Sequence, residues 1–291
     1  MLKQIFIKNK SYLSFQNNSL HVKNNDYNTT ISLDDIDILI IENQQTVLTT
    51  ALLSKLAQKN ICTVFVDKKF MPSAINIPLY KNSRVSHIQK AQIKISKPKH
   101  NQLWKKIIIE KIKHQSFVLK KYQNSDAIEG LREKVKSADK SNIEALAANI
   151  YFPKLFGKEF TRRDDNTINA ALNYGYSIIR SSIARYIIAY GLNPIFGIFH
   201  SNQLNNFNLA DDLIEVFRPI IDEFVYTNIN KNIKFNFQHQ KKFVLLLYEY
   251  NLFDIEENKK VSLDNAIKKI VASYQSFCLN KRDDINIPVM V

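Results

Sequence analysis

Glycine and cysteine are scarce in this sequence, which has five glycines and two cysteines among 291 residues. So few glycines leave no GxGxxG or GxxxxGK[ST] loop, which excludes the common dinucleotide-binding and P-loop nucleotide sites. The two cysteines, Cys62 and Cys278, form neither a CxxC pair nor a disulfide framework, so we expect buried free thiols. A disulfide-stabilised scaffold and enzymes built on those two nucleotide motifs are therefore excluded.

Long apolar runs are also missing. None approaches the roughly 20 residues needed to span a bilayer, and the first ten residues, MLKQIFIKNK, lack the apolar core of a signal peptide. We therefore expect a cytoplasmic protein without a membrane partner.

Acidic residues are outnumbered, because 27 aspartates and glutamates stand against 41 lysines and arginines, for a formal net charge of +14. Such a chain is expected to meet a polyanion. Nucleic acid is the commonest, and an anionic membrane surface is the lesser alternative. Most of the excess lies in residues 81–140, which hold 16 basic and 5 acidic residues, so 16 − 5 = +11. Contact with DNA phosphates is favoured for this group over a lysine face that is merely solvated. The candidate DNA contacts in this segment are Arg84, Lys105 and Lys106. Farther along the chain, further candidates that could reach phosphates or stack on bases are Arg162, Arg163, Asn166, Tyr174 and Arg180.

Residues 1–80 alternate polar and apolar side chains in short segments rich in β-formers: KQIFIK, SYLSFQ, SLHVKN, DIDILIIE and ICTVFVD. This pattern predicts a small β-rich domain. The Asn17-Asn18 pair between two of these runs predicts a hairpin turn, because asparagine tolerates positive φ. One helix, over residues 46–59, is expected to interrupt the strands.

Helical spacing replaces the alternation after Pro78. Residues 84–291 are therefore predicted to form a larger all-α domain, which makes the fold class α+β. The last two helices are expected over QHQKKFVLLLYEYNLF and VSLDNAIKKIVASYQSFCLN.

Two helices of this domain carry residues of interest. One is expected over residues 142–151 with Ser141 as N-cap, and Glu144 then occupies either the capping-box position or a ligand position. The other is expected over residues 166–190, where Gly175 indicates close packing against a neighbouring element.

Residues 200–222, HSNQLNNFNLADDLIEVFRPIID, place acidic side chains on a predicted helix with Asn208 as N-cap. Asp211 and Asp212 precede Glu215 by four and three residues, so these carboxylates share one side of the helix. Like charges so placed repel unless a cation lies among them, and neutralising Glu215 is then expected to relieve repulsion. The alternative is a solvated acidic face.

Glu144, His200 and Glu215 come from three segments of the helical domain and offer two carboxylates and one imidazole nitrogen. This set suits Mg²⁺ or Mn²⁺, which keep waters for substrate oxygens. Zinc is disfavoured, because neither a cysteine ligand nor a second good histidine is present. A divalent cation beside a basic surface indicates phosphodiester chemistry. Convergence of the three residues is a hypothesis at this stage.

Four segments add a resemblance to a known family: EALAANIYF at 144–152, NTINAALNYGYSIIRSSI at 166–183, His200 after GIF, and NLADDLIEVFRPIID at 208–222. With them the chain resembles the CRISPR-associated spacer-acquisition integrases, above all members from type II systems. The resemblance implies that Glu144, His200 and Glu215 bind the metal. It also implies that Asp211 and Asp212 support these ligands.

The resemblance further implies an activity and an assembly. The chain would be a metal-dependent DNA endonuclease and integrase that inserts short DNA segments into a CRISPR repeat array, by attack of a 3′-hydroxyl on a phosphodiester. Residues 1–80 would form a homodimer and residues 84–291 would carry catalysis. The dimers would join a dimeric ferredoxin-fold subunit in a hetero-hexamer, alongside other type II adaptation proteins. Two alternatives stay open, namely a stand-alone metal-dependent nuclease and a non-catalytic helical nucleic-acid-binding protein.

Overall fold

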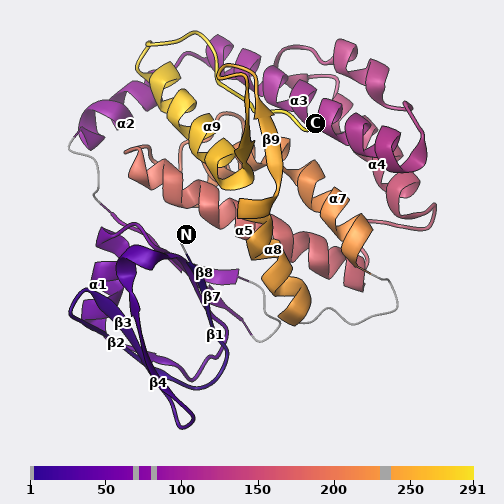
Figure 1. The fold of residues 1–291 in the computed structure, drawn as a ribbon. Coiled ribbons are helices and arrows are strands. Elements are labelled where there is room, and N and C mark those ends of the chain that lie inside the picture. The colour runs from indigo at the N-terminus through magenta and orange to yellow at the C-terminus, as the bar shows by residue number, and fades with distance from the viewer. Residues whose placement is uncertain (1–2, 68–71, 80–83, 230–236) are drawn as a thin grey trace. The chain divides into compact units, whose positions relative to one another are not determined.

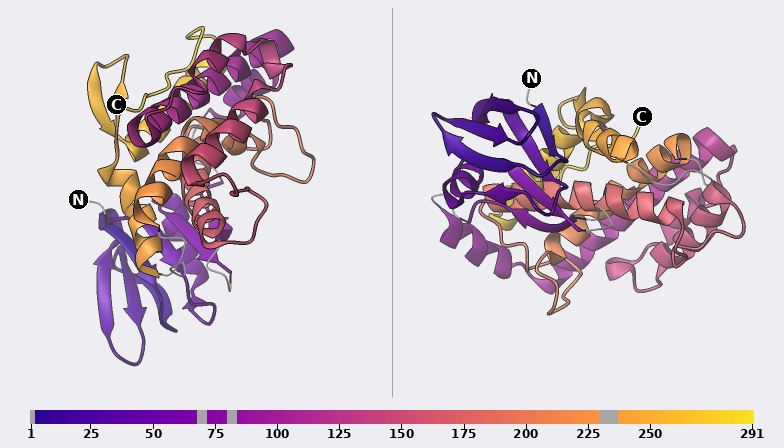
Figure 2. Two further views of the ribbon diagram at one scale, coloured as in Figure 1. Left: turned by 90° about the vertical axis from the view of Figure 1, so that its right-hand side faces the viewer. Right: turned by 90° about the horizontal axis from the view of Figure 1, so that it is seen from below.

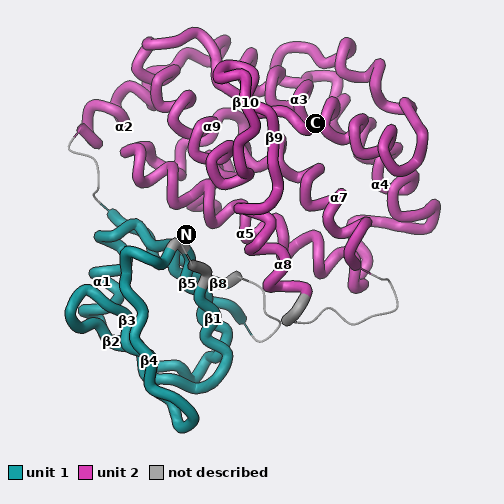
Figure 3. The backbone as a smooth tube through the Cα atoms, in the orientation of Figure 1, with its two compact units in different colours: residues 1–83 teal, residues 84–291 magenta. Residues whose placement is uncertain are grey.

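The computed structural model divides the chain into two compact units, residues 1–83 and 84–291 (Figure 3). It describes residues 3–67, 72–79, 84–229 and 237–291. The sequence predicts domains over residues 1–80 and 84–291.

The described residues of unit 1 form two four-stranded sheets, with the strand orders β1-β5-β7-β8 and β4-β3-β2-β6 (Figure 1). In the first sheet β1, β5 and β7 are parallel, and β8 is antiparallel to β7. In the second sheet β2, β3 and β4 are antiparallel, and β6 is parallel to β2. The elements are β1 (Lys3–Ile7), β2 (Tyr12–Gln16), β3 (Ser19–Lys23), β4 (Asn28–Ser32), η1 (Leu33–Asp35), β5 (Ile36–Ile41), β6 (Val47–Leu48), α1 (Thr50–Gln58), β7 (Cys62–Val66) and β8 (Pro72–Asn76).

The alternating pattern explains how these strands pack. Leu20 and Val22 of β3 are buried in the core, whereas Ser19, His21 and Lys23 are less buried. β5 lies between two other strands, and its residues 38–41 are all buried, as expected for a strand covered on both faces. Asn17 and Asn18 have φ values of 47° and 55°, which confirms the predicted turn between β2 and β3.

Unit 2 is mainly helical (Figures 1 and 2). Its elements are α2 (Val85–Ile93), α3 (Lys97–Gln123), η2 (Glu129–Lys134), η3 (Ser137–Asp139), α4 (Ile143–Phe156), α5 (Thr167–Ala189), α6 (Asn208–Leu213), η4 (Ile214–Val216), α7 (Arg218–Asn228), α8 (Phe237–Glu249), β9 (Asn251–Asp254), β10 (Lys259–Ser262) and α9 (Leu263–Cys278).

Helix α3 packs against α4, η4 and α7 and is buried around much of its circumference. Trp104, Ile108 and Ile112 are buried as predicted, but so is Lys111. Several other lysines of α3 are paired with acidic side chains: Lys106 with Asp284, Lys113 with Glu110, Lys120 with Glu129, and Lys121 with Glu223. The basic surface predicted for this helix is therefore partly neutralised within the protein.

The fold class is confirmed, because a β-rich region precedes a helical one. The all-α description of unit 2 is wrong at one place, where β9 and β10 form an antiparallel hairpin. Val289 extends this hairpin by exchanging two backbone hydrogen bonds with Phe253, of 2.8 and 2.9 Å. The helix predicted through Phe253 ends at Glu249, because Leu252 and Asp254 are buried in alternation, which is a strand pattern.

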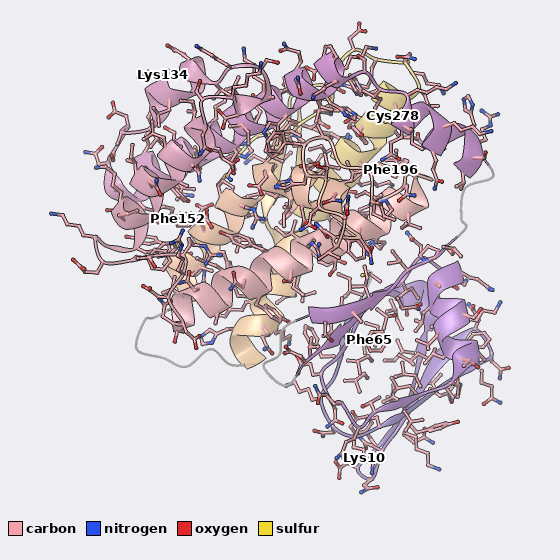
Figure 4. All side chains as sticks on the ribbon, turned by 180° about the vertical axis from the view of Figure 1, so that it is seen from behind. Lys10, Phe65, Lys134, Phe152, Phe196 and Cys278 are labelled. Carbon is pink, nitrogen blue, oxygen red and sulfur yellow. The ribbon has the colours of Figure 1, made fainter. Side chains whose placement is uncertain are left out.

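Cys62 and Cys278 are both buried and neither belongs to a disulfide, as predicted, and Figure 4 labels Cys278 at the end of α9. Across the described ranges, no helix combines the length and apolarity that crossing a bilayer requires.

Gly175 of α5 lies close to two side chains, as predicted. A Cβ atom there would be 2.6 Å from Ile221 Cγ2 and 2.6 Å from Phe243 Cε1. Gly175→Ala is therefore expected to lower the free energy of unfolding by about 1–3 kcal/mol, because overpacking outweighs the gain of about 1 kcal/mol in helix propensity. Denaturant melts measure this, with Gly130→Ala as control, since nothing lies within 4 Å of a Cβ at Gly130. Equal stability of Gly175→Ala and the wild type would contradict the packing argument.

Candidate active site

Glu144 lies in the first turn of α4, whose start is held by an aspartate. The Asp139 carboxylate accepts hydrogen bonds from the backbone N–H groups of Ile143 and Glu144, both at 2.9 Å. It thereby satisfies two of the donors that a helix start exposes. Asn142, which lies between Asp139 and Ile143 in the sequence, has a φ of 52°, in the left-handed region that asparagine tolerates. The prediction of Ser141 as N-cap is therefore wrong, and the Glu144 side chain contacts α3 instead of capping its own helix.

Glu215 lies in the 3₁₀ turn η4, between α6 and α7. The predicted continuous helix is interrupted here, and Pro219 lies in the first turn of α7, where its missing N–H costs no hydrogen bond. Asn208 is not the predicted N-cap. Its side-chain amide donates to three carbonyl oxygens of the preceding loop at 3.0–3.1 Å and holds that loop against α6.

Lys111 of α3 joins the two glutamates. Its Nζ lies 2.5 Å from Glu144 Oε1 and 2.5 Å from Glu215 Oε2. The other Glu215 oxygen, Oε1, accepts a hydrogen bond from Arg218 Nε at 2.7 Å. The structure thus brings two of the three predicted ligands to one cationic group, at a position where the side chains of Lys111 and Glu215 are 9% and 7% exposed.

The charges at this position stabilise one another. Burial raises the pKa of the Glu215 carboxyl, but the charges of Lys111 and Arg218 and their hydrogen bonds outweigh burial and lower that pKa to about 2. Burial also lowers the pKa of Lys111, and the charges of Glu215 and Glu144 reverse this and raise it. The stability contributed by Glu215 is present above its ordinary pKa of 4.5 and is lost as the pH falls toward 2.

His200 is held by Asp212. Its Nδ1 lies 2.6 Å from Asp212 Oδ1. The same buried carboxylate accepts hydrogen bonds from the backbone N–H groups of Ile198, Phe199 and His200, at 2.5, 3.0 and 3.1 Å. The loop is so close that a Cβ atom on Gly197 would lie 2.3 Å from the His200 carbonyl oxygen and 2.7 Å from Asp212 Oδ2. This arrangement fixes the imidazole and leaves Nε2 as the nitrogen that can bind a metal.

Aromatic packing places this loop on α3. Trp104 stacks on Phe199 with ring centroids 4.5 Å apart and an interplanar angle of 3°, and the His200 ring lies edge-on to Trp104 at 5.6 Å. Figure 4 labels Phe196 in the same loop. Trp104 and Lys111 are seven residues apart, so they share one face of α3, about 10 Å apart along its axis. This face therefore contacts both the histidine and the carboxylate pair.

The donors of this face fit a hard divalent cation. Glu144 and Glu215 already share one positively charged group, the Lys111 ammonium, and His200 offers an oriented nitrogen. Within the part of the chain that the structure describes, no three His, Cys, Asp or Glu side chains are close enough to hold a metal ion. The structure brings Glu144 and Glu215 together and leaves His200 with Asp212, so convergence of all three stays a prediction.

Asp211 has different partners from Asp212. Its Oδ1 lies 2.5 Å from Arg180 Nε and its Oδ2 lies 3.0 Å from Arg180 Nη2, and Asn205 donates to Oδ2 at 2.6 Å. Of the two adjacent aspartates, it is therefore Asp212 that contacts a predicted ligand.

The predicted DNA contacts differ in how available their side chains are. Tyr174 is fully buried, so its predicted role in contacting DNA is wrong. Asn166 caps α5 by accepting a hydrogen bond from the Asn169 N–H at 2.9 Å. Others are bound within the protein: Lys106 to Asp284, Arg162 to Asn169 and Asn173, and Arg180 to Asp211. Arg84 and Arg163 are exposed and Lys105 is half-buried.

The sequence interpretation misses Lys111, Arg218 and Trp104 as parts of the site. It groups Lys111 with a basic surface and Trp104 with the core. A signal for Lys111 was present, since Trp104, Ile108 and Lys111 follow the i, i+4, i+7 spacing of one buried helix face. A lysine within such a stripe requires a buried acidic partner.

The His200–Asp212 contact predicts a dependence on pH. The hydrogen bond that the His200 ring donates to Asp212 raises the pKa of His200 above 6.5, with help from nearby carboxylate charges and against the opposing effect of burial. Asp212→Asn should shift that pKa back down, because the amide carries no charge. The stability due to this pair is fully present below pH 6.5 and is lost as the pH rises through the raised pKa. In Asp212→Asn the decrease in stability with rising pH should disappear. The free energy of unfolding at neutral pH should also fall by about 1–3 kcal/mol, because backbone N–H groups of residues 198–200 lose a carboxylate acceptor.

An NMR titration of the His200 ring protons measures this effect directly. Asp211→Asn is the matched control, since it removes the same charge one residue away without touching the ring. A His200 pKa that is unchanged by Asp212→Asn, or is lowered equally by both variants, would contradict the assignment.

Comparisons with known proteins identify relatives of this chain in sequence and in fold. Residues 5–252 match a family described as CRISPR associated protein Cas1. The CRISPR-associated endonuclease Cas1 of Neisseria meningitidis is 38% identical over 291 residues, covering 96% of this chain and 93% of that protein. A casposase bound to an integration product has a TM-score of 0.80 at 19% identity, covering 98% of this chain and 93% of that one. A chain of a Cas6-RT-Cas1–Cas2 complex has a TM-score of 0.74 at 16% identity, covering 97% of this chain and 35% of that one. These two structural matches show a shared fold.

Proposed function

Because the chain belongs to the CRISPR-associated Cas1 family, we propose that it is a metal-dependent DNA endonuclease and integrase that inserts short DNA segments into a CRISPR repeat array. The supporting observation is the convergence of Glu144 and Glu215 on one buried cationic position, on the face of α3 that also contacts His200. Two carboxylates and an imidazole are donors that suit Mg²⁺ or Mn²⁺ in phosphodiester chemistry.

Each side chain of the site has a task in this proposal. Mg²⁺ or Mn²⁺ held by Glu144, His200 and Glu215 would supply Lewis-acid stabilisation of the charge that develops on the phosphoryl group. Asp212 orients the His200 ring and keeps Nε2 available. Arg218 binds the second Glu215 oxygen and fixes the orientation of that carboxylate.

The proposed reaction exchanges one phosphodiester for another. The 3′-hydroxyl oxygen of the short DNA forms a bond to a phosphorus at the repeat boundary and releases its proton to water. The bond between that phosphorus and its original 3′-oxygen breaks, and the departing oxygen takes up a proton. The number of phosphodiesters is unchanged, so no nucleotide is hydrolysed, in keeping with a sequence that has no P-loop.

The same proposal includes partners. A net charge of +14 favours DNA. The folds shared with a casposase bound to an integration product and with a chain of a Cas6-RT-Cas1–Cas2 complex support DNA and a Cas2-type subunit as partners. The chain would form a homodimer through residues 1–80, and two such dimers would join a dimeric ferredoxin-fold subunit in a hetero-hexamer.

A joining assay tests this function. A labelled short duplex with free 3′-hydroxyl ends is incubated with a repeat-bearing target in Mg²⁺, in Mn²⁺ or in EDTA. Joined product is expected with either ion, and EDTA should abolish joining while DNA binding persists. Cleavage without joining would indicate a stand-alone nuclease, and binding without either reaction would indicate a non-catalytic binder.

Exposed lysines near the start of α4 are predicted to contact DNA phosphates. Lys136 and Lys140 flank Asp139, and both are exposed. Changing both to glutamate is expected to lower DNA affinity at low salt by about tenfold or more. It should also reduce the slope of log K against log salt concentration by about 2, because each phosphate contact releases about one counterion.

Fluorescence anisotropy at several salt concentrations measures both quantities. Lys241→Glu/Lys242→Glu is the matched control, because these exposed lysines of α8 give the same change in net charge. Equal losses in the two double variants would show that net charge, and not a local phosphate contact, sets the affinity.

A further inference from the structure

The spacing of the two active-site carboxylates is set by a lysine. Glu144 Oε1 and Glu215 Oε2 are each 2.5 Å from Lys111 Nζ, so they are at most twice that distance, 5.0 Å, apart. Two oxygens bound to one divalent ion at about 2.0–2.6 Å are separated by at most about 4–5 Å. The two carboxylates therefore already lie at a distance that one divalent cation can bridge.

The Lys111 ammonium is buried on a part of α3 whose other buried side chains include apolar isoleucines. Ile107, Ile108 and Ile112 of the same helix are fully buried apolar residues. At such a position an apolar side chain costs the fold less than a lysine, because an ammonium must give up its hydration. A lysine occupies this position where carboxylates from α4 and η4 meet. Its role is thus tied to that pair and not to core packing.

We propose that Lys111 is a resident cation of the active site, which holds Glu144 and Glu215 in place before a divalent ion binds and competes with that ion for the same two oxygens. The inference rests on the proposed function, since it takes this carboxylate pair as the metal position. Without a metal, the ammonium offsets the repulsion between the two carboxylates. A divalent ion must displace it from both, so Lys111 is a positioning residue that also sets the metal concentration the protein requires.

Mn²⁺ titrations of the full chain by calorimetry test this directly. Lys111→Met keeps an unbranched side chain and removes the charge. It is expected to bind Mn²⁺ at least about tenfold more tightly than the wild type, because the competitor is gone. In EDTA it should melt at a lower temperature, and saturating Mn²⁺ should raise its Tm more than that of the wild type. Lys106→Met is the matched control, since it removes a half-buried, ion-paired lysine from the same helix and should leave Mn²⁺ affinity unchanged.

Lys111→Gln covers the case in which the methionine variant does not fold. Glutamine can still donate hydrogen bonds to the carboxylates but carries no charge, so it should also bind Mn²⁺ more tightly than the wild type. Mn²⁺ affinity that is unchanged or weakened in both variants would overturn the inference. Glu215→Gln separates this result from failure of the proposed function. If Glu215→Gln in the otherwise wild-type chain, which keeps Lys111, does not weaken Mn²⁺ binding, then the carboxylate pair is not the metal site.

Discussion

Glu215→Gln is expected to slow strand joining at least about a thousandfold while leaving DNA affinity within about twofold, because loss of a metal ligand removes several kcal/mol of transition-state stabilisation. The amide matches the glutamate in size but lacks the charge that holds a divalent cation. The variant should also unfold more easily, by about 3 kcal/mol, because buried Lys111 and half-buried Arg218 each lose a charged partner. This sign is opposite to the sequence-based expectation of relieved repulsion, which did not include the two bases.

Joining rates, DNA affinity and thermal melts have to be measured on the same preparation. Glu223→Gln is the matched control, because Glu223 is also a buried, ion-paired glutamate of this region, bound to Lys121. It should lose stability to a similar extent and retain joining. A Glu215→Gln protein that joins DNA at the wild-type rate would remove Glu215 from the metal site.

Trp104→Ala should lower the free energy of unfolding by about 3–5 kcal/mol, the largest effect among these substitutions. Trp104 is only 1% exposed, so its removal leaves a cavity in the core. Joining should fall with it, even at temperatures where the variant is folded. Phe199 loses the ring on which it stacks, and His200 loses the edge contact that fixes its loop against α3.

Trp104→Phe separates packing from positioning, since a smaller ring can still stack on Phe199. We expect it to recover most of the joining activity and about half of the lost stability. The measurements are denaturant melts and joining rates at a temperature well below the melting transition. Full joining activity in folded Trp104→Ala would show that the aromatic contacts do not position His200.

The fold could be predicted where burial on one side of an element leaves a periodic pattern. Leu20 and Val22 illustrate this for the first unit, and the change of period after Pro78 for the second. The hairpin of β9 and β10 was missed because its inward residues are Leu252 and Asp254. A buried aspartate resembles an exposed polar residue in a pattern, and its partner Lys269 lies beyond the hairpin in the sequence.

The site was predictable only at the level of donor chemistry. Residue types and the family resemblance pointed to Glu144, His200 and Glu215. The contacts that position them are long-range ion pairs and hydrogen bonds, such as Lys111 to Glu144 and Asp212 to the loop before it. Spacing rules describe neighbours on one helix and carry no information about such pairs. Tyr174 was misjudged for a related reason, since tyrosine occurs in cores as well as on surfaces.

Helix α3 also fixes the distance and the angle between the two halves of the active site. The residue that supports His200 and the residue that joins the two carboxylates both belong to this one rigid helix. Inserting or deleting a single residue between Trp104 and Lys111 would rotate Lys111 relative to Trp104 by about 100° around the helix axis. It would also shift Lys111 by about 1.5 Å along that axis. The imidazole and the carboxylates would then face different directions, so no repacking of side chains could restore a common substrate position. The seven-residue interval between Trp104 and Lys111 therefore has a fixed length.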